Sequence, residues 1–174
     1  DSIPLPTLPA GVRHVRVPAD VMRAVSPAQT PQGALAVCGM PERALPECLE
    51  GRRYVVLDGV QDPGNVGTIL RTADAFHADG VFLLPGCADL YNPKTIRATM
   101  GAVFRCPVWT CAPEQLRALL SRSGLAIGSE GKGLSQQMLE LCDRTVRIPM
   151  SPHCESLNAA AAAAVVLWEA ARMD

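Results

Sequence analysis

The chain has 174 residues, of which 48% are hydrophobic, enough to bury the core of one domain with an appendage but too few for two full domains. Its net charge of -1 and pI of about 6.3 are not the strongly basic balance that usually marks a nucleic-acid-binding domain, so composition alone does not predict such a partner. The longest apolar run, Ala159 to Trp168, is far shorter than the about 20 residues that a membrane-spanning helix needs.

Proline punctuates the first fifty residues, which show little sustained periodicity. We interpret residues 1–50 as a linker and the remnant of a truncated domain, because the chain begins with Asp1 and not with Met. Within this region we expect one or two helical turns at Ala19–Ala24 and a short strand at Ala34–Val37, after the turn Pro31-Gln32-Gly33.

From Arg53 onward, β-rich runs alternate with helical stretches. The strand Tyr54–Leu57, a helix at about Asn65–Ala78 and the strand Val81–Leu84 form a βαβ pattern. The later elements that we expect, in chain order, are a short helix after Asn92-Pro93, a strand at Val103–Trp109, a helix at Pro113–Arg122, a strand at Leu125–Ile127, a short helix at Leu134–Leu141, a strand at Thr145–Ile148 and a last helix at Leu157–Ala171. This alternation predicts an α/β fold for residues 51–174, with a mostly parallel sheet and helices on both of its faces.

The last expected helix has Ser156 in position to be its N-cap and a run of six alanines from Ala159 to Ala164. The high helix propensity of alanine is one explanation for this run. The alternative is close packing, because such small side chains allow another backbone to approach.

Seven cysteines are an odd number, and none of them forms a C-x-x-C pair. We expect buried free thiols in a protein of the reducing cytoplasm. The adjacent His153 and Cys154 raise the alternative of a metal ligand pair or a thiol nucleophile, but no second ligand pair accompanies them, so no metal is predicted.

Three loops that follow expected strands carry polar or glycine-rich motifs, where α/β proteins place their ligands. The first runs from Asp58 to Arg71 and contains Asn65; the second is Gly128-Ser129-Glu130-Gly131-Lys132-Gly133; the third joins Arg147-Ile148-Pro149-Met150 to Glu155-Ser156-Leu157-Asn158.

Each motif has an ordinary structural explanation when it is taken alone. Asn65, Ser156 and Asn158 are common helix-capping residues, and a lone helical Arg71 is usually solvated. The glycine-rich loop fits neither the P-loop nor the dinucleotide-binding spacing. No acid or histidine stands at the spacing that a hydrolase reading of Ser156 requires.

Together, and in this order, the three motifs resemble those of the SpoU (TrmH) family of RNA 2'-O-ribose methyltransferases, a branch of the SPOUT superfamily. The resemblance covers about Arg53 to Arg172, and Asn92-Pro93-Lys94 and the stretch 98–108 support it. Residues 25–33 are similar to the segment that joins an N-terminal RNA-binding domain to the catalytic domain in some members. His77 is a departure, since many relatives have glycine there.

The resemblance implies a deep trefoil knot near the C-terminus, a homodimer with the active site at its interface, and S-adenosyl-L-methionine as cofactor. The residues that would hold the cofactor are Thr99, Met100, Gly101, Ile127, Gly128, Gly131, Ile148, Met150, Ser156 and Leu157.

The same resemblance implies methylation of a ribose 2'-hydroxyl in RNA, with ribosomal RNA favoured over transfer RNA. The catalytic set would be Arg71, Asn65, Glu130, Ser156 and Asn158, and the RNA-facing cations Arg71, Lys94, Arg97, Arg105 and Lys132. For Arg71 we favour phosphate binding and stabilisation of the developing alkoxide over a role as base, because a neutral guanidine is scarce.

Two other functions stay open at this point. One is a non-catalytic RNA-binding or assembly factor with the same fold, and the other is a nucleotide-binding oxidoreductase, although the G-x-G-x-x-G fingerprint of that class is missing after the first strand.

Overall fold

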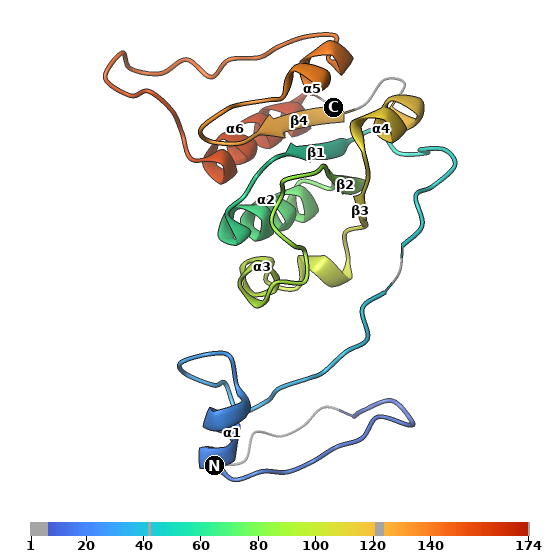
Figure 1. Cartoon of the computed structure of the whole chain (residues 1–174), viewed down its shortest axis with the longest axis vertical. Helices are drawn as coiled ribbons and strands as arrows, with labels where there is room; N and C mark the ends of the chain where they lie inside the picture. Colours follow the sequence, from blue (N-terminus) through green and yellow to red (C-terminus); the bar gives the residue numbers. More distant parts are fainter. Residues whose placement is uncertain (1–6, 42, 121–123, 174) are drawn as a thin grey trace. The chain divides into compact units, whose positions relative to one another are not determined.

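A computed structural model describes residues 7–41, 43–120 and 124–173 (Figure 1). The chain divides into two compact units, Asp1–Pro41 and Glu42–Asp174, and each is described by itself.

Within residues 7–41, the first unit contains one short helix, α1 (Ala19–Val25), none of whose residues is buried. The strand expected at Ala34–Val37 is wrong, since these residues are exposed and Val37 is 96% exposed. A strand needs a neighbour for its backbone N–H and C=O groups, and no described residue of this unit pairs with the segment.

The second unit is built on a parallel sheet in the order β3-β2-β1-β4, with β1 at Tyr54–Asp58, β2 at Gly80–Leu83, β3 at Val108–Thr110 and β4 at Gly124–Gly128. All residues of β1 and β2 are buried. That burial on both faces explains why the two strands are continuous apolar runs and do not alternate with polar residues.

Helices cover both faces of the sheet, as the alternating pattern predicts. On one face Val55, Leu57 and Val81 pack against α2 (Pro63–Ala75) and α6 (Ala159–Arg172). On the other face Val56 and Phe82 pack against α4 (Pro113–Leu119) and α5 (Gln136–Leu141). Two shorter elements, α3 (Pro93–Ala98) and the 3₁₀ helix η1 (Ala102–Phe104), follow β2.

The strand expected at Val103–Trp109 is shorter than predicted. Gly101 has a φ of 87° and begins the turn η1, in which Phe104 N–H donates to the carbonyl of Gly101. Only Val108–Thr110 pairs with β2. The expected strand at Thr145–Ile148 is also wrong: these residues form no ladder with the described strands, and Thr145, Val146 and Arg147 are exposed.

Two helix starts differ from the sequence prediction by a few residues. The α2 helix begins at Pro63, where the side chain of Asp62 accepts a hydrogen bond from Asn65 N–H, so Asp62 is the cap and not Asn65. The α6 helix begins at Ala159, and Asn158 is its cap in place of Ser156. The α4 helix ends at Leu119, and residues 121 and 122 of the expected helix lie outside the described residues.

Candidate functional site

The loops after β1 and β4 begin side by side. Asp58 pairs with Gly128 in the parallel register of these strands, so the first and second motifs leave the same edge of the sheet. The α2 and α6 helices pack on the same face of the sheet and contact each other, which brings the start of α6 to this edge (Figure 1). The fold thus gathers the three motifs.

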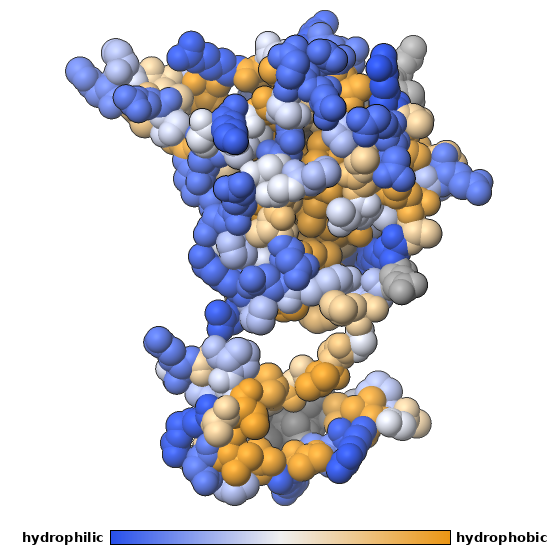
Figure 2. Space-filling model, in the orientation of Figure 1, coloured by the Kyte–Doolittle hydropathy of each residue, from blue (hydrophilic) through white to orange (hydrophobic). Residues whose placement is uncertain are grey.

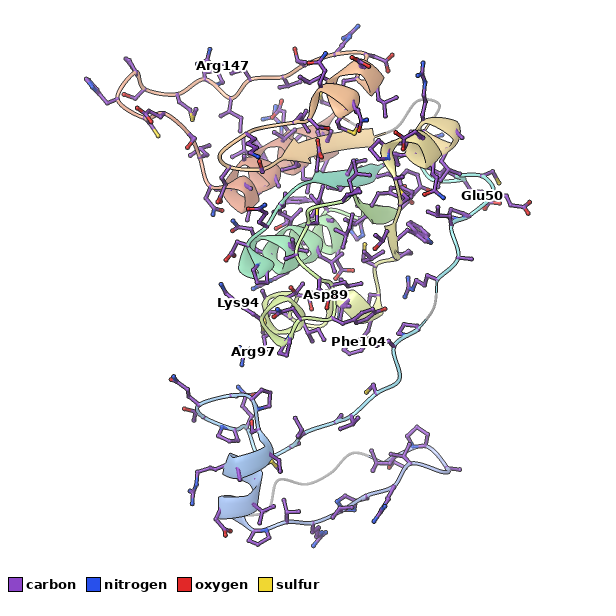
Figure 3. The ribbon with its side chains drawn as sticks, in the orientation of Figure 1. Glu50, Asp89, Lys94, Arg97, Phe104 and Arg147 are labelled. Atoms are coloured by element: carbon purple, nitrogen blue, oxygen red, sulfur yellow. The ribbon has the colours of Figure 1, made fainter. Side chains whose placement is uncertain are left out.

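A cavity of about 1080 Å³ opens next to β4. Its walls are the end of β4, the glycine-rich loop, α5, the extended segment 142–157 that carries Arg147 (Figure 3), and the first turns of α6. Of the residues predicted to hold a cofactor, those that line it are Ile127, Gly128, Ile148, Met150, Ser156 and Leu157.

The other predicted cofactor residues do not line this cavity. Gly131 is exposed at the tip of the glycine-rich loop. Thr99, Met100 and Gly101 lie between α3 and η1, where the Thr99 hydroxyl donates to the carbonyl of Ile96 at 2.7 Å. Their assignment to a cofactor stays a prediction.

The glycine-rich loop is closed on itself. Ser129 and Gly133 exchange backbone hydrogen bonds of 3.1 and 2.9 Å, and the Ser129 hydroxyl accepts from Lys132 N–H. A Cβ at position 128 would collide with the carbonyl group of Gly133, so only glycine permits this close return of the backbone. Glu130 lies on this loop and is exposed.

One carboxylate oxygen joins all three motifs. Glu130 Oε1 accepts hydrogen bonds from Asn65 Nδ2 at 2.7 Å, from Asn158 Nδ2 at 2.7 Å and from the backbone N–H of Ala159 at 3.0 Å. Asn158 Nδ2 also donates to Asn65 Oδ1 at 2.9 Å. We call Asn65, Glu130 and Asn158 the polar cluster.

The N-terminus of α6 supports this arrangement. Asn158 Oδ1 accepts from the backbone N–H groups of Ala160 and Ala161. A carboxylate at the end of a 14-residue helix is favoured by the free N–H groups and by the helix dipole. The cap fixes the Asn158 side chain, and the helix end attracts the charge of Glu130.

Two aspartates that the motif argument missed hold the site in place. Asp58 is only 8% exposed, and its Oδ2 accepts from Ser135 N–H at 2.6 Å, which ties β1 to the end of the glycine-rich loop. Asp62 caps α2 and pairs with Lys94 Nζ at 2.9 Å. The hydrogen bond from Lys94 is the largest cause that lowers the pKa of Asp62. The sequence contained a signal for this role, because an Asp followed by Pro is typical of a cap and the first residue of a helix.

Arg71 lies on the face of α2 that is turned toward α3 and η1. On this face a Cβ at Gly67 would lie 2.6 Å from Cβ of Ala98, and Asp74 pairs with Arg105 at 2.6 Å. Residues 67, 71 and 74 are three or four positions apart and so share one side of the helix. Arg71 is exposed there and is not part of the hydrogen bonds of the polar cluster.

The other predicted RNA-facing cations are all exposed. Lys94 is paired with Asp62 and Arg105 with Asp74, whereas Arg97 has no ion pair among the described residues. Ser156 is exposed on the cavity wall and Lys132 on the glycine-rich loop. The structure therefore brings Asn65, Glu130 and Asn158 into direct contact, with Ser156 beside the same cavity as Glu130.

The cysteines are free thiols, but only part of the expected burial is correct. Cys106 and Cys111 are buried, and burial raises the pKa of each to about 11. Cys38, Cys48 and Cys154 are exposed. Among the described residues no group of three or more His, Cys, Asp or Glu side chains is arranged to hold a metal ion. None of the described helices has the length and apolar character to cross a membrane.

A parallel α/β domain whose strand-end loops build a polar cluster beside a large cavity defines the class of ligand-binding α/β enzymes. Comparison with known proteins gives the family. Residues 52–122 and 114–168 match the SpoU rRNA Methylase family, and the chain belongs to this family.

Relatives over nearly the whole chain support the assignment. The chain is 35% identical to the 23S rRNA (guanosine(2553)-2'-O)-methyltransferase RlmP of Bacillus subtilis, over 92% of this chain and 73% of that protein. It superposes on AviRb of Streptomyces viridochromogenes, solved in complex with AdoMet, with a TM-score of 0.80 and 30% identity over 94% of this chain and 75% of that one.

An AdoMet-bound rRNA methyltransferase from Sinorhizobium meliloti is 34% identical, with a TM-score of 0.67 over 72% of this chain. The chain spans 57% of the length of that protein.

Proposed function

We propose that this chain is an RNA 2'-O-ribose methyltransferase that uses S-adenosyl-L-methionine and acts on ribosomal RNA. The observation that carries the proposal is the contact of Asn65, Glu130 and Asn158 around one oxygen atom at the rim of the cavity. Relatives that are named as 23S rRNA 2'-O-methyltransferases support the same reaction and the preference for ribosomal RNA.

The cavity suits the methyl donor. Its volume of about 1080 Å³ is slightly above the roughly 300–1,000 Å³ that is usual for ligand pockets. Ile127, Ile148, Met150 and Leu157 offer apolar walls for a flat ring, and Gly128 also lines the cavity. These residues, with Ser156, would hold the cofactor, which when bound supplies a methyl group already activated by a positively charged sulfur.

The residues of the chain then position the acceptor. The reaction forms a bond between the ribose 2'-oxygen and the methyl carbon, breaks the bond between that carbon and sulfur, leaves the electron pair on sulfur and passes the hydroxyl proton to solvent water. Oε1 of Glu130 already accepts three hydrogen bonds. Oε2 is therefore the oxygen that would accept a hydrogen bond from a ribose hydroxyl. Asn65, Ser156 and Asn158 would orient the sugar beside it.

Arg71 would bind a phosphate of the substrate and stabilise the alkoxide that develops on the 2'-oxygen. A guanidinium keeps its proton far above neutral pH and provides several donors in a fixed plane, which suits this task better than proton abstraction.

The test is the variant Arg71→Ala. We expect methyl transfer to fall about 100-fold or more, as for the loss of one oxyanion donor, while S-adenosyl-L-methionine binds with unchanged affinity in calorimetry. Arg71→Lys, which keeps the charge and loses the planar fork, should recover part of the rate. Unchanged turnover of Arg71→Ala would remove this residue from the mechanism.

The substrate is identified by methylation of total RNA from a strain that lacks the gene, with labelled cofactor and mapping of the modified ribose. Label in ribosomal RNA supports the proposal, and label in transfer RNA makes the chain a transfer RNA methyltransferase. If no RNA is labelled and the protein does not bind the cofactor, the methyltransferase proposal is wrong and the non-catalytic RNA-binding function is favoured.

We also propose that the enzyme works as a two-fold homodimer and that its C-terminal part forms a deep trefoil knot. Val165 and Trp168 of α6 are 46% and 49% exposed, which supports a partner on this helix, and membership in the family supports the knot. Sedimentation at micromolar concentration should give the mass of two chains, and a single-chain mass argues against the dimer.

A further inference from the structure

We propose that Phe104, at the end of η1, is a stacking platform for an unpaired base of the RNA substrate. The inference rests on the proposed function and adds a contact that neither the motifs nor the polar cluster contains.

Phe104 stands out because it is 74% exposed, whereas Phe82 is fully buried and Phe76 packs against the core. Met100, on the same short segment, is 67% exposed and has a φ of 48°, a backbone conformation that costs energy for a side chain of this kind. Figure 2 shows apolar residues (orange) that reach the surface of this unit among hydrophilic ones (blue). Exposed aromatic rings are the groups that proteins use to stack bases.

Two exposed arginines, Arg97 and Arg105, belong to the same surface segment as Phe104. Figure 3 shows Arg97 on α3 and Phe104 on the neighbouring η1. Arg97 is exposed and has no ion pair among the described residues. Arg105, the next residue after Phe104, donates from Nε and Nη2 to Asp74 Oδ2 at 3.0 and 2.6 Å, which holds its guanidinium against α2. An aromatic ring flanked by arginines complements a base flanked by phosphates.

The surface formed by Arg97, Met100, Phe104 and Arg105 is connected to Arg71 through α2. Asp74 of α2 holds Arg105, and Arg71 lies one turn before Asp74 on the same face of the helix. A nucleotide whose phosphate meets Arg71 therefore places a neighbouring base within reach of Phe104. Bases inside an A-form duplex are not accessible to a ring, so the platform predicts a single-stranded or bulged target.

The experiment compares Phe104→Ala, Phe104→Leu and Phe104→Tyr in methyl transfer from labelled S-adenosyl-L-methionine to total RNA of a strain lacking the gene. Stacking needs an aromatic ring and not only apolar area. We therefore expect the half-saturating RNA concentration to rise about tenfold for Ala and Leu and to stay unchanged for Tyr. The KM for S-adenosyl-L-methionine should not change in any variant.

Three outcomes separate the possibilities. No methyl transfer by the unaltered protein would count against the proposed function itself. If the unaltered protein is active and all three variants match it, the platform is wrong. If Leu behaves like Phe and Phe104→Ala alone lowers activity together with the sedimenting mass, the ring packs against another protein chain, and RNA stacking is overturned.

Discussion

At the scale of single residues, the site depends on how many donors share one acceptor. Glu130 Oε1 receives two side-chain amides and one backbone N–H. A hydrogen bond to a charged group is stronger than a neutral one, because the charge is complemented in a fixed geometry. Glu130 is nevertheless exposed, so its bonds orient the cluster and contribute little to global stability.

Because Glu130 orients the cluster but adds little to stability, Glu130→Ala should affect activity more than folding. The variant leaves Asn65 and Asn158 without their common acceptor, and we expect methyl transfer to fall at least about tenfold. The free energy of unfolding should change by less than about 1 kcal/mol, because the residue is exposed. Initial rates and urea unfolding measure the two effects. Glu50→Ala, an exposed glutamate outside the cavity lining, is the matched control, and equal rates for both variants would refute the role of Glu130.

The members of the polar cluster were predictable from the sequence because they belong to motifs that recur together. Asp58 was not, since its partner Ser135 is 77 positions away and no local pattern connects the two. The capping role given to Ser156 was wrong by two residues for a similar reason. Serine and asparagine are both good caps, and the contact of Asn158 with Glu130 decides between them.

At the scale of elements, the close approach of α2 and α3 fixes the position of α2, which carries Asn65 and Arg71 of the first motif. A Cβ on Gly67 would collide with the carbonyl of Thr95 and lie 2.6 Å from Cβ of Ala98. The Lys94–Asp62 pair joins α3 to the start of α2, and the Arg105–Asp74 pair joins the end of η1 to the last turns of α2. The absence of a side chain at position 67 therefore sets the distance between these helices.

Gly67→Ala should destabilise the protein although alanine favours a helix over glycine by about 1 kcal/mol. Overpacking of a tight contact costs about 1–3 kcal/mol, and here the obstacle includes backbone that cannot rotate away. Thermal unfolding compared with Thr68→Ala, at an exposed position of the same helix, provides the measurement. A higher melting temperature for Gly67→Ala would contradict the contact.

The elements that periodicity predicted well are the fully buried strands β1 and β2 and the helix α2, one face of which is buried. The failures share a physical cause. Thr145–Ile148 and Ala34–Val37 have apolar residues typical of strands, but strand formation depends on a neighbouring strand that a sequence window does not contain. The expected strand at 103–109 lost its first residues because Gly101, with its left-handed backbone, begins the 3₁₀ helix η1 there.

At the scale of the whole molecule, the sheet separates two cores, and each contains a buried thiol. Cys106 belongs to the core with α2 and α6, and Cys111 to the core with α4 and α5. Burial raises the pKa of both thiols from 9.0 to about 11, because a thiolate is disfavoured in these apolar surroundings.

Stability should therefore fall in alkaline solution. The unfolded chain releases these protons near pH 9 while the folded chain keeps them to about pH 11, so the stabilisation is complete below pH 9 and is lost between these values. Urea midpoints measured from pH 8 to 10.5 should decline, and the double variant Cys106→Ala, Cys111→Ala should show a shallower decline from a lower starting value. Parallel curves for the two proteins would exclude the thiols as the cause.

Asn65 and Asn158, which contact each other, are 93 positions apart in the chain. The ribosome therefore synthesises one well before the other. At a synthesis rate of about 5–20 residues per second, roughly 5 to 20 seconds separate the emergence of these two side chains from the ribosome. Throughout that interval β1 has already emerged, but the nascent polypeptide lacks the asparagine that completes the cluster. The polar cluster is thus completed only after the start of α6 has left the ribosome.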